Sequence, residues 1–322
     1  MPAVSAMHLD SILPRAFEKR RNLFALVDTN CFRLFNGDGD GIPGLTIDLY
    51  GGFILIQYFS PALAQYTSHI LKYLKSAENL PPVELKGFLL KNRIKPAGTK
   101  DIRTERESVL IEGSLPPPGY AVRQNGMEAV VDLVRGQNTG VFLDMREVRD
   151  SLVGFYRASD VMLNLFCYTA LFSMHALRNG ISGTVNVDLS KRVLSRAREN
   201  YRLNGFSVDE RDFLYGDARD WIRIFRKKGR MFSFIVFDPP TFSRNRVRNF
   251  SSSRHYQDYL SLLEPLGADG YMLTSVNSYS ISVDQYKSFH PAEWRLELFH
   301  HESSDFPNLG DPYLKTGLWK IK

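Results

Sequence analysis

The chain has few cysteines, no long apolar run and no glycine-rich phosphate motif. Only Cys31 and Cys167 occur in 322 residues, without a CxxC or histidine-rich companion, so we expect neither a disulfide framework nor a metal site. The N-terminal segment lacks the apolar core of a signal peptide, and no apolar stretch approaches about 18 residues. These absences predict a soluble, cytoplasmic protein that does not span a membrane.

What is present favours a globular protein with a polyanionic partner. Hydrophobic residues make up 43% of the chain, which is ample for a core. The formal net charge is +6 and the pI is near 9.2. This mild basic excess favours partners such as RNA without proving one.

The pattern changes near residue 120. Before it, "LTIDLY" and "FILIQYF" flank Gly51-Gly52, which predicts a hairpin, and a second hairpin is expected at Asn125-Gly126. Between the hairpins, "SLPPPGY" has the composition of a stiff linker. We therefore expect a smaller α+β domain over residues 1–120, with a role in recognising RNA or substrate, and a second domain over residues 121–322.

The second half alternates apolar strands with helices. "VMLNLF", "TVNVD", "FSFIVF" and "YMLTSV" are separated by helical patterns such as "KRVLSRARENYRLN". This alternation predicts an α/β Rossmann-like fold, with a parallel sheet covered by helices on both faces. Ligands of such sheets bind beyond the carboxyl ends of the strands.

A calcium-loop pattern in the first half is incomplete. "NGDGDGIPGLTID" places Asn36, Asp38 and Asp40 at ligand positions 1, 3 and 5, but Ile47 stands where a bidentate carboxylate is needed. The flanking segments have strand patterns. A glycine-rich turn leading into a strand is the better interpretation.

The first strand of the second half ends at Asn164-Leu165-Phe166 and leads through Cys167-Tyr168-Thr169-Ala170 into a helix. A dinucleotide site would have GxGxxG here, because glycines let the backbone approach a pyrophosphate. That motif is absent. S-adenosylmethionine has no phosphates and removes the requirement.

Carboxylates follow the next three strands. Asp188 is placed to bind ribose hydroxyls, and Asp217 to hold an adenine amine, with helix capping as the alternative for each. In "FIVFDPP", Asp238 would stand beside the transferable methyl group, and Pro239 and Pro240 would restrict the backbone. An ordinary turn is the alternative there.

One stretch is a candidate for RNA binding. "SRNRVRNFSSSRHY", residues 243–256, alternates guanidinium groups, which suit phosphates, with rings that suit unstacked bases. The alternative is a solvated connection. The expected RNA-binding residues are Arg244, Arg246, Arg248, Phe250, Arg254 and Tyr256.

From Leu34 to Lys322 the sequence resembles the bacterial and archaeal large-subunit ribosomal RNA methyltransferases of the cytosine-C5 type and their guanine-N7 relatives. The resemblance rests on "GDGDGIPGLTIDLYG", "GQNTGVFLDMREVR", "LNLFCYTALFSMHA", "VDLSKRVLSRARENYRLNG", "GDARDW", "FDPPTFS" and "DFPNLGDPYLK". It implies that residues 137–146 fold against the methionine end of S-adenosylmethionine. The implied cofactor-binding residues are Gln137, Thr139, Phe142, Arg146, Asn164, Phe166, Tyr168, Thr169, Asp188, Leu189, Ser190, Asp217, Ala218 and Asp238.

Three departures from the family pattern matter. The segment before "GDGDG" is too short for the family's PUA-type RNA-binding module, so RNA capture is expected elsewhere. Ala170 replaces a glycine, which crowds the cofactor loop slightly. Asn277 stands where C5 members carry a nucleophilic cysteine.

The missing thiol bears on the reaction. Cytosine C5 becomes nucleophilic only after a thiolate adds to the ring, whereas guanine N7 carries a lone pair and needs only in-line positioning. An exocyclic amine is a further option, with Asp238 accepting its hydrogen bond, although Thr241 stands where amine methyltransferases have an aromatic residue.

We therefore expect an S-adenosylmethionine-dependent RNA methyltransferase, with Asp238 and Asn277 as catalytic residues and guanine N7 of ribosomal RNA as the favoured target. The alternatives are a catalytically silent RNA-binding or ribosome-assembly factor, and a methyltransferase for a protein or small molecule. The sequence leaves the oligomeric state open, with a homodimer as one option.

Overall fold

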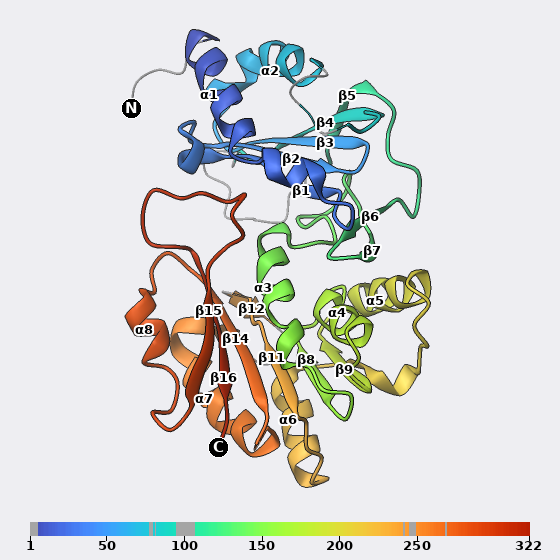
Figure 1. The fold of residues 1–322 in the computed structure, drawn as a ribbon, viewed down its shortest axis with the longest axis vertical. Helices are drawn as coiled ribbons and strands as arrows, with labels where there is room; N and C mark the ends of the chain where they lie inside the picture. Colours follow the sequence, from blue (N-terminus) through green and yellow to red (C-terminus); the bar gives the residue numbers. More distant parts are fainter. Residues whose placement is uncertain are drawn as a thin grey trace. The chain divides into compact units, whose positions relative to one another are not determined.

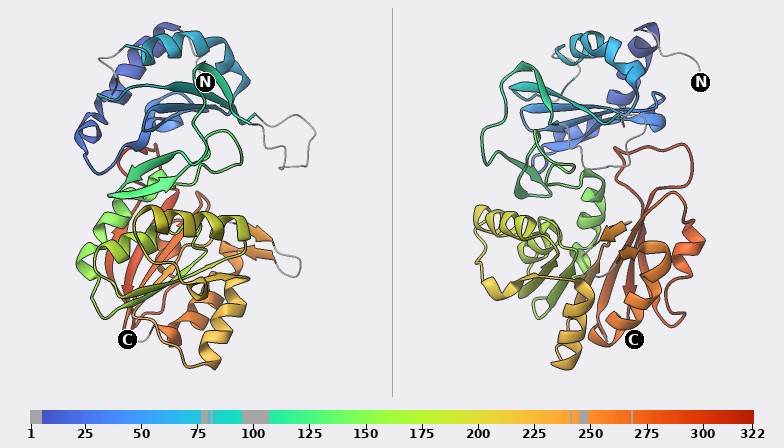
Figure 2. Two further views of the ribbon diagram at one scale, coloured as in Figure 1. Left: turned by 90° about the vertical axis from the view of Figure 1, so that its right-hand side faces the viewer. Right: turned by 180° about the vertical axis from the view of Figure 1, so that it is seen from behind.

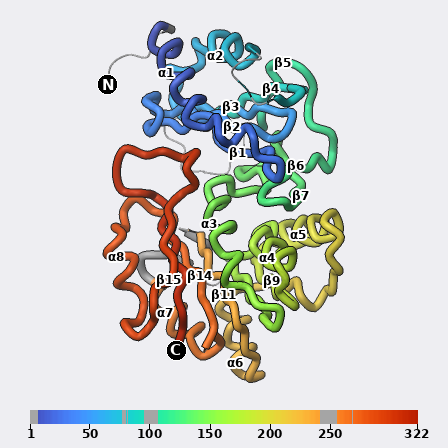
Figure 3. Tube along the Cα trace, viewed as in Figure 1, coloured from blue at the N-terminus to red at the C-terminus, as the bar shows by residue number. Residues whose placement is uncertain are grey.

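The computed structural model describes residues 6–76, 80, 82–94, 107–240, 242–244, 249–267 and 269–322. The chain forms two compact units (Figure 1). Unit 1 comprises Met1–Asp144 with Ser303–Gly310, and unit 2 comprises Met145–Glu302 with Asp311–Lys322. Figure 3 traces the chain, in which residues 303–310 leave unit 2 and the next residues return to it. Within the described ranges, no helix has the length and apolar character needed to cross a membrane.

Unit 1 is built on a five-stranded sheet in which only the β3 and β4 strands pair in parallel. Helices α1 (Ala6–Glu18) and α2 (Thr67–Leu74) cover one face (Figure 2). Apolar side chains from alternate strand positions and from both helices form its core. The strands in sheet order are β1 (Cys31–Asn36), β2 (Leu45–Tyr50), β3 (Phe53–Tyr58), β4 (Gly87–Asn92) and β5 (Val109–Gly113).

Both expected hairpins are confirmed. Tyr50 pairs with Phe53 across the turn between β2 and β3. The second hairpin joins β6 (Ala121–Gln124) to β7 (Met127–Val130). Its turn residues Asn125 and Gly126 have φ of 53° and 73°, as a two-residue turn that follows the strand twist requires.

The boundary between the units lies later than residue 120. The Arg123 carbonyl accepts a hydrogen bond from the Asn30 N–H at 2.8 Å, and the Gly126 N–H donates to the Asp28 carbonyl at 2.9 Å. These bonds tie the second hairpin to unit 1. The proline-rich segment is therefore a connection inside this unit, and the chain passes into unit 2 between Asp144 and Met145.

The glycine-rich motif in unit 1 forms a cradle for the returning segment. Asp40 pairs with the buried Arg20 at 2.6 Å, and Arg20 also donates to the Asp305 carbonyl at 2.7 Å. A Cβ placed on Gly39 would lie 1.7 Å from the Pro307 carbonyl oxygen. Only glycine fits such a close approach of two backbones, so Gly39 and Asp40 have a structural explanation.

Unit 2 contains a seven-stranded sheet with the order β10-β9-β8-β11-β14-β16-β15. The first five strands are parallel, as expected, but β16 runs antiparallel to both of its neighbours. The strands are β8 (Val161–Leu165), β9 (Gly183–Asp188), β10 (Phe213–Tyr215), β11 (Phe234–Phe237), β14 (Tyr271–Asn277), β15 (Arg295–His300) and β16 (Leu314–Lys320).

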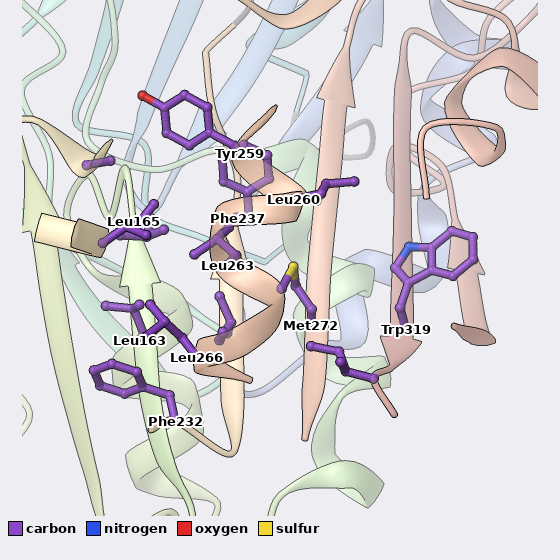
Figure 4. Packing of buried hydrophobic residues seen from close by; sticks show 14 of the residues in the cluster. Leu163, Leu165, Phe232, Phe237, Tyr259, Leu260, Leu263, Leu266, Met272 and Trp319 are labelled. Atoms are coloured by element: carbon purple, nitrogen blue, oxygen red, sulfur yellow. The ribbon is translucent and has the colours of Figure 1, made fainter. Parts of the chain in front are cut away.

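Helices cover both faces of this sheet. Side chains of α6, α7 and α8 pack on one face, and those of α3 and α4 on the other, where α5 contacts β9 and β10. Figure 4 shows Tyr259, Leu260 and Leu263 of α7 against Phe237 and Met272 of the strands. The helices are α3 (Arg146–Ser151), α4 (Leu171–Arg178), α5 (Lys191–Leu203), α6 (Ala218–Lys227), α7 (Ser252–Leu263) and α8 (Val283–Lys287).

Candidate functional site

The order in which the parallel strands follow one another across the sheet reverses between β8 and β11. From β8 the parallel order continues outward to β9 and β10, whereas from β11 it continues to β14 on the other side. Neighbouring loops diverge at such a switch point, and ligands of open α/β sheets bind there, outside the carboxyl ends of the strands. Asp188, Asp238 and Asn277 stand at or just beyond the carboxyl ends of β9, β11 and β14.

The loop after β8 has a strained backbone. Phe166, Tyr168 and Ala170 have φ of 55°, 48° and 65°. Left-handed backbone is unfavourable for residues with a Cβ and persists only where the surroundings hold it. Ala170 is fully buried and occupies the position of the family's glycine, so its methyl group adds to this strain.

Hydrogen bonds to the neighbouring elements hold that loop. The Cys167 N–H donates to the Val187 carbonyl at 3.0 Å. The Thr169 carbonyl accepts from Asn200 Nδ2 of α5 at 3.1 Å. The Tyr168 N–H donates to Asp188 Oδ2 at 3.1 Å. A strained loop anchored at successive residues suits a preorganised ligand site.

Asp188 supports the backbone around it. Its Oδ1 accepts from the Ser190 N–H at 2.9 Å, in addition to the Tyr168 bond. Burial raises the pKa of this carboxyl despite these backbone donors. Capping of α5, the alternative interpretation, belongs instead to Ser190, whose side chain accepts from the Val193 N–H. A partly desolvated carboxylate at this edge is available for a polar ligand.

Asp217 does cap a helix. Its side chain accepts a hydrogen bond from the Arg219 N–H at 2.9 Å at the start of α6. Ala218, the first residue of α6, is buried. The capping alternative is thus realised, and a contact with adenine remains a proposal for this residue.

The side chain of Asn164 belongs to a polar network in the core. Its Nδ2 donates to Ser173 Oγ at 2.8 Å, and Ser173 Oγ donates to Asn186 Oδ1 at 2.7 Å. Asn186 in turn donates to the Tyr201 hydroxyl at 3.1 Å. Asn164 is 2% exposed. Its amide therefore connects β8 to α4, and the structure gives no support for a direct cofactor contact by this side chain.

At the other side of the switch point, Asp238 follows β11. Its Oδ1 accepts a hydrogen bond from Ser275 Oγ of β14. The preceding Phe237 ring stacks on Tyr259 of α7, with centroids 5.4 Å apart. Asn277 ends β14 and is exposed. The two expected catalytic residues thus come from neighbouring strands, with Asp238 oriented by a hydroxyl.

Three of the expected cofactor residues belong to unit 1, and Arg146 begins α3 of unit 2. The Thr139 hydroxyl lies 3.0 Å from the hydroxyl of Tyr50. The Gln137 carbonyl accepts from Arg93, and Lys91 donates to the Gly136 carbonyl. Phe142 is 39% exposed. Cationic side chains of unit 1 therefore hold the segment that contains Gln137 by its carbonyl oxygens.

The expected RNA-binding stretch is only partly described. Arg246 and Arg248 lie outside the described residues, and Arg244 and Phe250 are placed by backbone alone, in β12 (Phe242–Arg244) and β13 (Asn249–Ser251). Arg254 belongs to α7, again by its backbone alone.

Tyr256 does not fit the expected role. It is 1% exposed, its ring lies 5.1 Å from that of Phe237, and its hydroxyl donates to the Ser275 carbonyl at 3.0 Å. Helical periodicity in α7 turns this tyrosine into the core. The ring therefore has no face available for an RNA base in this structure.

Sequence reasoning missed Lys315, in the antiparallel strand β16. This lysine is fully buried, and its Nζ donates to the Ser278 carbonyl at 2.7 Å. Burial lowers its pKa. A buried, perturbed ammonium at the carboxyl edge is a signal of function, but its position emerges only when β16 is paired with β14.

The fold and this edge define a Rossmann-like protein that binds a small polar cofactor. The chain belongs to the S-adenosylmethionine-dependent methyltransferase family, whose sequence pattern matches residues 32–307. The strained loop after β8 and the partly buried carboxylate at the end of β9 suit S-adenosylmethionine, which is the cofactor of this family. The expected fold class, cofactor and family are thereby confirmed.

Two relatives of this chain are named for ribosomal RNA methylation. YwbD of Bacillus subtilis, named as a candidate ribosomal RNA large subunit methyltransferase, is 32% identical over 286 residues, covering 88% of this chain and 70% of the relative. Ribosomal RNA large subunit methyltransferase I of Aeromonas salmonicida is 33% identical over 268 residues, covering 82% and 66%. The chain therefore spans about two thirds of the length of these relatives.

A solved structure supports the same assignment. The crystal structure of SMU.776 complexed with SAH has a TM-score of 0.87 and 26% sequence identity. The match covers 100% of this chain and 83% of the SMU.776 chain. SAH is S-adenosylhomocysteine, the form that remains after the methyl group has been transferred.

Proposed function

We propose that this protein methylates a base of large-subunit ribosomal RNA and that guanine N7 is the acceptor. The RNA substrate is supported by the names of the relatives. S-adenosylmethionine supplies an electrophilic methyl group on a sulfonium. The residues proposed to hold it are the loop from Phe166 to Thr169, Asp188 with Leu189 and Ser190, and Asp217 with Ala218.

The choice of guanine N7 over cytosine C5 rests on the burial of both cysteines, which makes their thiols poor nucleophiles. Cys31 is fully buried in unit 1. Cys167 is 6% exposed, and burial raises the pKa of its thiol well above the usual value. A thiol held in the protonated form is a poor nucleophile, and Asn277 ends β14 where the C5 relatives place theirs. Both facts disfavour a reaction that begins with thiolate addition.

Methylation of guanine N7 requires fewer catalytic groups than methylation of cytosine C5. Its lone pair needs no base to remove a proton, so the chain's task is to orient the acceptor in line with the methyl group. Asp238, oriented by Ser275, and Asn277 offer an acceptor and an amide at neighbouring strand ends. Each could hydrogen-bond the edge of a purine.

The test is nucleoside mass spectrometry of ribosomal RNA from cells with and without the gene. We expect 7-methylguanosine to disappear at one site and to return when the gene is restored. An Asp238→Ala protein should not restore it, whereas a Cys31→Ser/Cys167→Ser protein should, because no thiol takes part. Loss of 5-methylcytidine, or a cysteine-dependent adduct with RNA, would refute the proposal. Loss of a methylated exocyclic amine would keep the enzyme class and change the acceptor.

The arginine-rich stretch is proposed to capture RNA. Changing Arg244, Arg246 and Arg248 to alanine should weaken RNA binding and flatten its dependence on salt by about three phosphate contacts at most. Affinity for S-adenosylmethionine should not change. If the slope of log affinity against log salt is unaltered, these arginines do not contact phosphates.

The alternative to an enzyme is a catalytically silent assembly factor. Isothermal titration with S-adenosylmethionine distinguishes it cheaply from an enzyme. An enzyme should bind the cofactor in the micromolar range or tighter and release S-adenosylhomocysteine in the presence of RNA. A folded protein that binds RNA but not the cofactor would favour the silent factor.

A further inference from the structure

The turn after β14 is held from both sides by residues near the start of β16. The Ser278 N–H donates to the Tyr313 carbonyl at 2.7 Å, and the Ser278 carbonyl accepts from Lys315 Nζ at 2.7 Å. In the same register, Asn277 pairs with Leu314. Hydrogen bonds to both the N–H and the carbonyl of Ser278 therefore fix the backbone directly after Asn277.

Lys315 is an unusual choice for this position. It is fully buried, and placing an ammonium in the interior is costly unless charges and hydrogen bonds compensate it. Compensation comes from Glu302 and Asp311, which favour the charged lysine. Glu302 is itself 9% exposed and accepts from the Leu314 N–H at 3.2 Å.

Stability alone does not account for this arrangement. An apolar side chain of similar length would fill the same space without a desolvated charge, and replacements of that kind often leave proteins equally or more stable. Unlike an apolar residue, Lys315 donates a hydrogen bond to the Ser278 carbonyl and so fixes the position of the turn. The turn in question carries the residue proposed to orient the acceptor.

We propose that Lys315 is a positioning residue for methyl transfer, which holds the Asn277–Ser278 turn where the acceptor base must be oriented. The inference rests on the proposed function. It predicts that losing the lysine amine affects turnover through Asn277 and leaves the proposed cofactor residues at the ends of β8, β9 and β10 unchanged.

The same strand offers a matched control. Lys320, at the other end of β16, also donates its Nζ to a backbone carbonyl, that of Asp269. Its ammonium lies 4.9 Å from the centroid of the Tyr271 ring. Lys320→Met removes the same group, the same charge and the same kind of bond, but at the opposite edge of the sheet.

The experiment compares Lys315→Met, Lys320→Met, Asn277→Ala and the two double variants with Asn277→Ala. Steady-state transfer of a labelled methyl group to ribosomal RNA gives kcat, and isothermal titration gives the cofactor Kd. We expect Lys315→Met to lower kcat at least about tenfold with the cofactor Kd within about twofold, while Lys320→Met stays near wild type. Because Lys315 acts through Asn277, the Lys315→Met/Asn277→Ala enzyme should be no slower than the slower single variant.

Two results would overturn the inference. One is a kcat for Lys315→Met equal to that of Lys320→Met, and the other is a double variant whose loss is the product of the single losses. Should Lys315→Met fail to fold, Lys315→Gln takes its place with the same criteria, because its neutral side chain is one bond shorter than lysine and its amide should not reach the Ser278 carbonyl. A wild-type protein that binds cofactor but methylates no RNA would refute the proposed function, an outcome distinct from either of these.

Discussion

Replacing Asp188 with alanine should weaken cofactor binding by an amount that the structure limits. An ionised carboxylate has about four acceptor positions. The N–H groups of Tyr168 and Ser190 occupy two of them, and a contact with the Leu189 N–H uses a third. This leaves room for one strong bond to a ribose hydroxyl. One charge-assisted hydrogen bond is worth about 1.5–3 kcal/mol, so Kd should rise about 10- to 150-fold.

Isothermal titration of Asp188→Ala with S-adenosylmethionine measures this change, and a thermal melt checks the fold. Asp209→Ala is the matched control, because it removes the same charge from a carboxylate that caps a turn before β10 and pairs with Arg211. Its Kd should equal that of wild type. A folded Asp188→Ala protein whose Kd stays within about threefold of wild type would refute the assignment of Asp188 to the cofactor.

The dependence on pH gives a second check of the same carboxyl. Burial raises the pKa of Asp188, so cofactor affinity should fall as the pH decreases through that raised value. Stability should move the other way. The folded state binds the proton more readily than the unfolded state, so the destabilisation caused by burying the charge disappears as the pH falls. Parallel losses of affinity and stability on acidification of wild type, both absent in Asp188→Ala, would contradict this reasoning.

Further predictions concern three other positions. His290 is buried and bonds Thr274, and burial lowers its pKa to about 4. Its contribution of about 3 kcal/mol should be complete above pH 6.5 and lost as the pH falls towards 4, so His290→Asn should flatten urea-unfolding profiles in that window. Ala170→Gly should raise the free energy of unfolding by up to about 1 kcal/mol, since it removes a Cβ from left-handed backbone, and a measured loss would show that the methyl contacts outweigh the strain. Lys91→Met should speed hydrogen exchange at residues 136–139, and unchanged exchange would show that its bond to Gly136 does not hold that segment.

The local patterns predicted the strands and hairpins well because burial and turn chemistry act over short distances. Gly51 and Asn125 were correctly identified as turn residues, and the α/β alternation gave the parallel sheet. The antiparallel β16 was not predicted, because its pairing with β14 joins residues far apart in sequence. The same limit hid Lys315, whose meaning depends on its neighbour across the sheet.

Side-chain direction was the other limit. Asn164 and Tyr256 stand at positions where a ligand contact is plausible, yet Asn164 bonds Ser173 and Tyr256 is enclosed by aromatic rings. Polarity in the sequence does not reveal whether a hydroxyl or amide has a partner inside the protein. For Asp188 and Asp238 the structure confirms only the position at the carboxyl ends of β9 and β11, and their roles stay predictions.

The return of residues 303–310 to unit 1 makes the two units topologically inseparable. A fragment ending at Asp144 would lack Asp305, and so would lose the carbonyl that accepts from Arg20 and the carboxylate that accepts from the Arg33 N–H at 2.8 Å. The close backbone contact between Gly39 and Pro307 would also be missing. Fusions and truncations that cut the chain at residue 144 should therefore give a destabilised unit 1. Evolution could exchange the N-terminal module only together with a short piece of the C-terminal one.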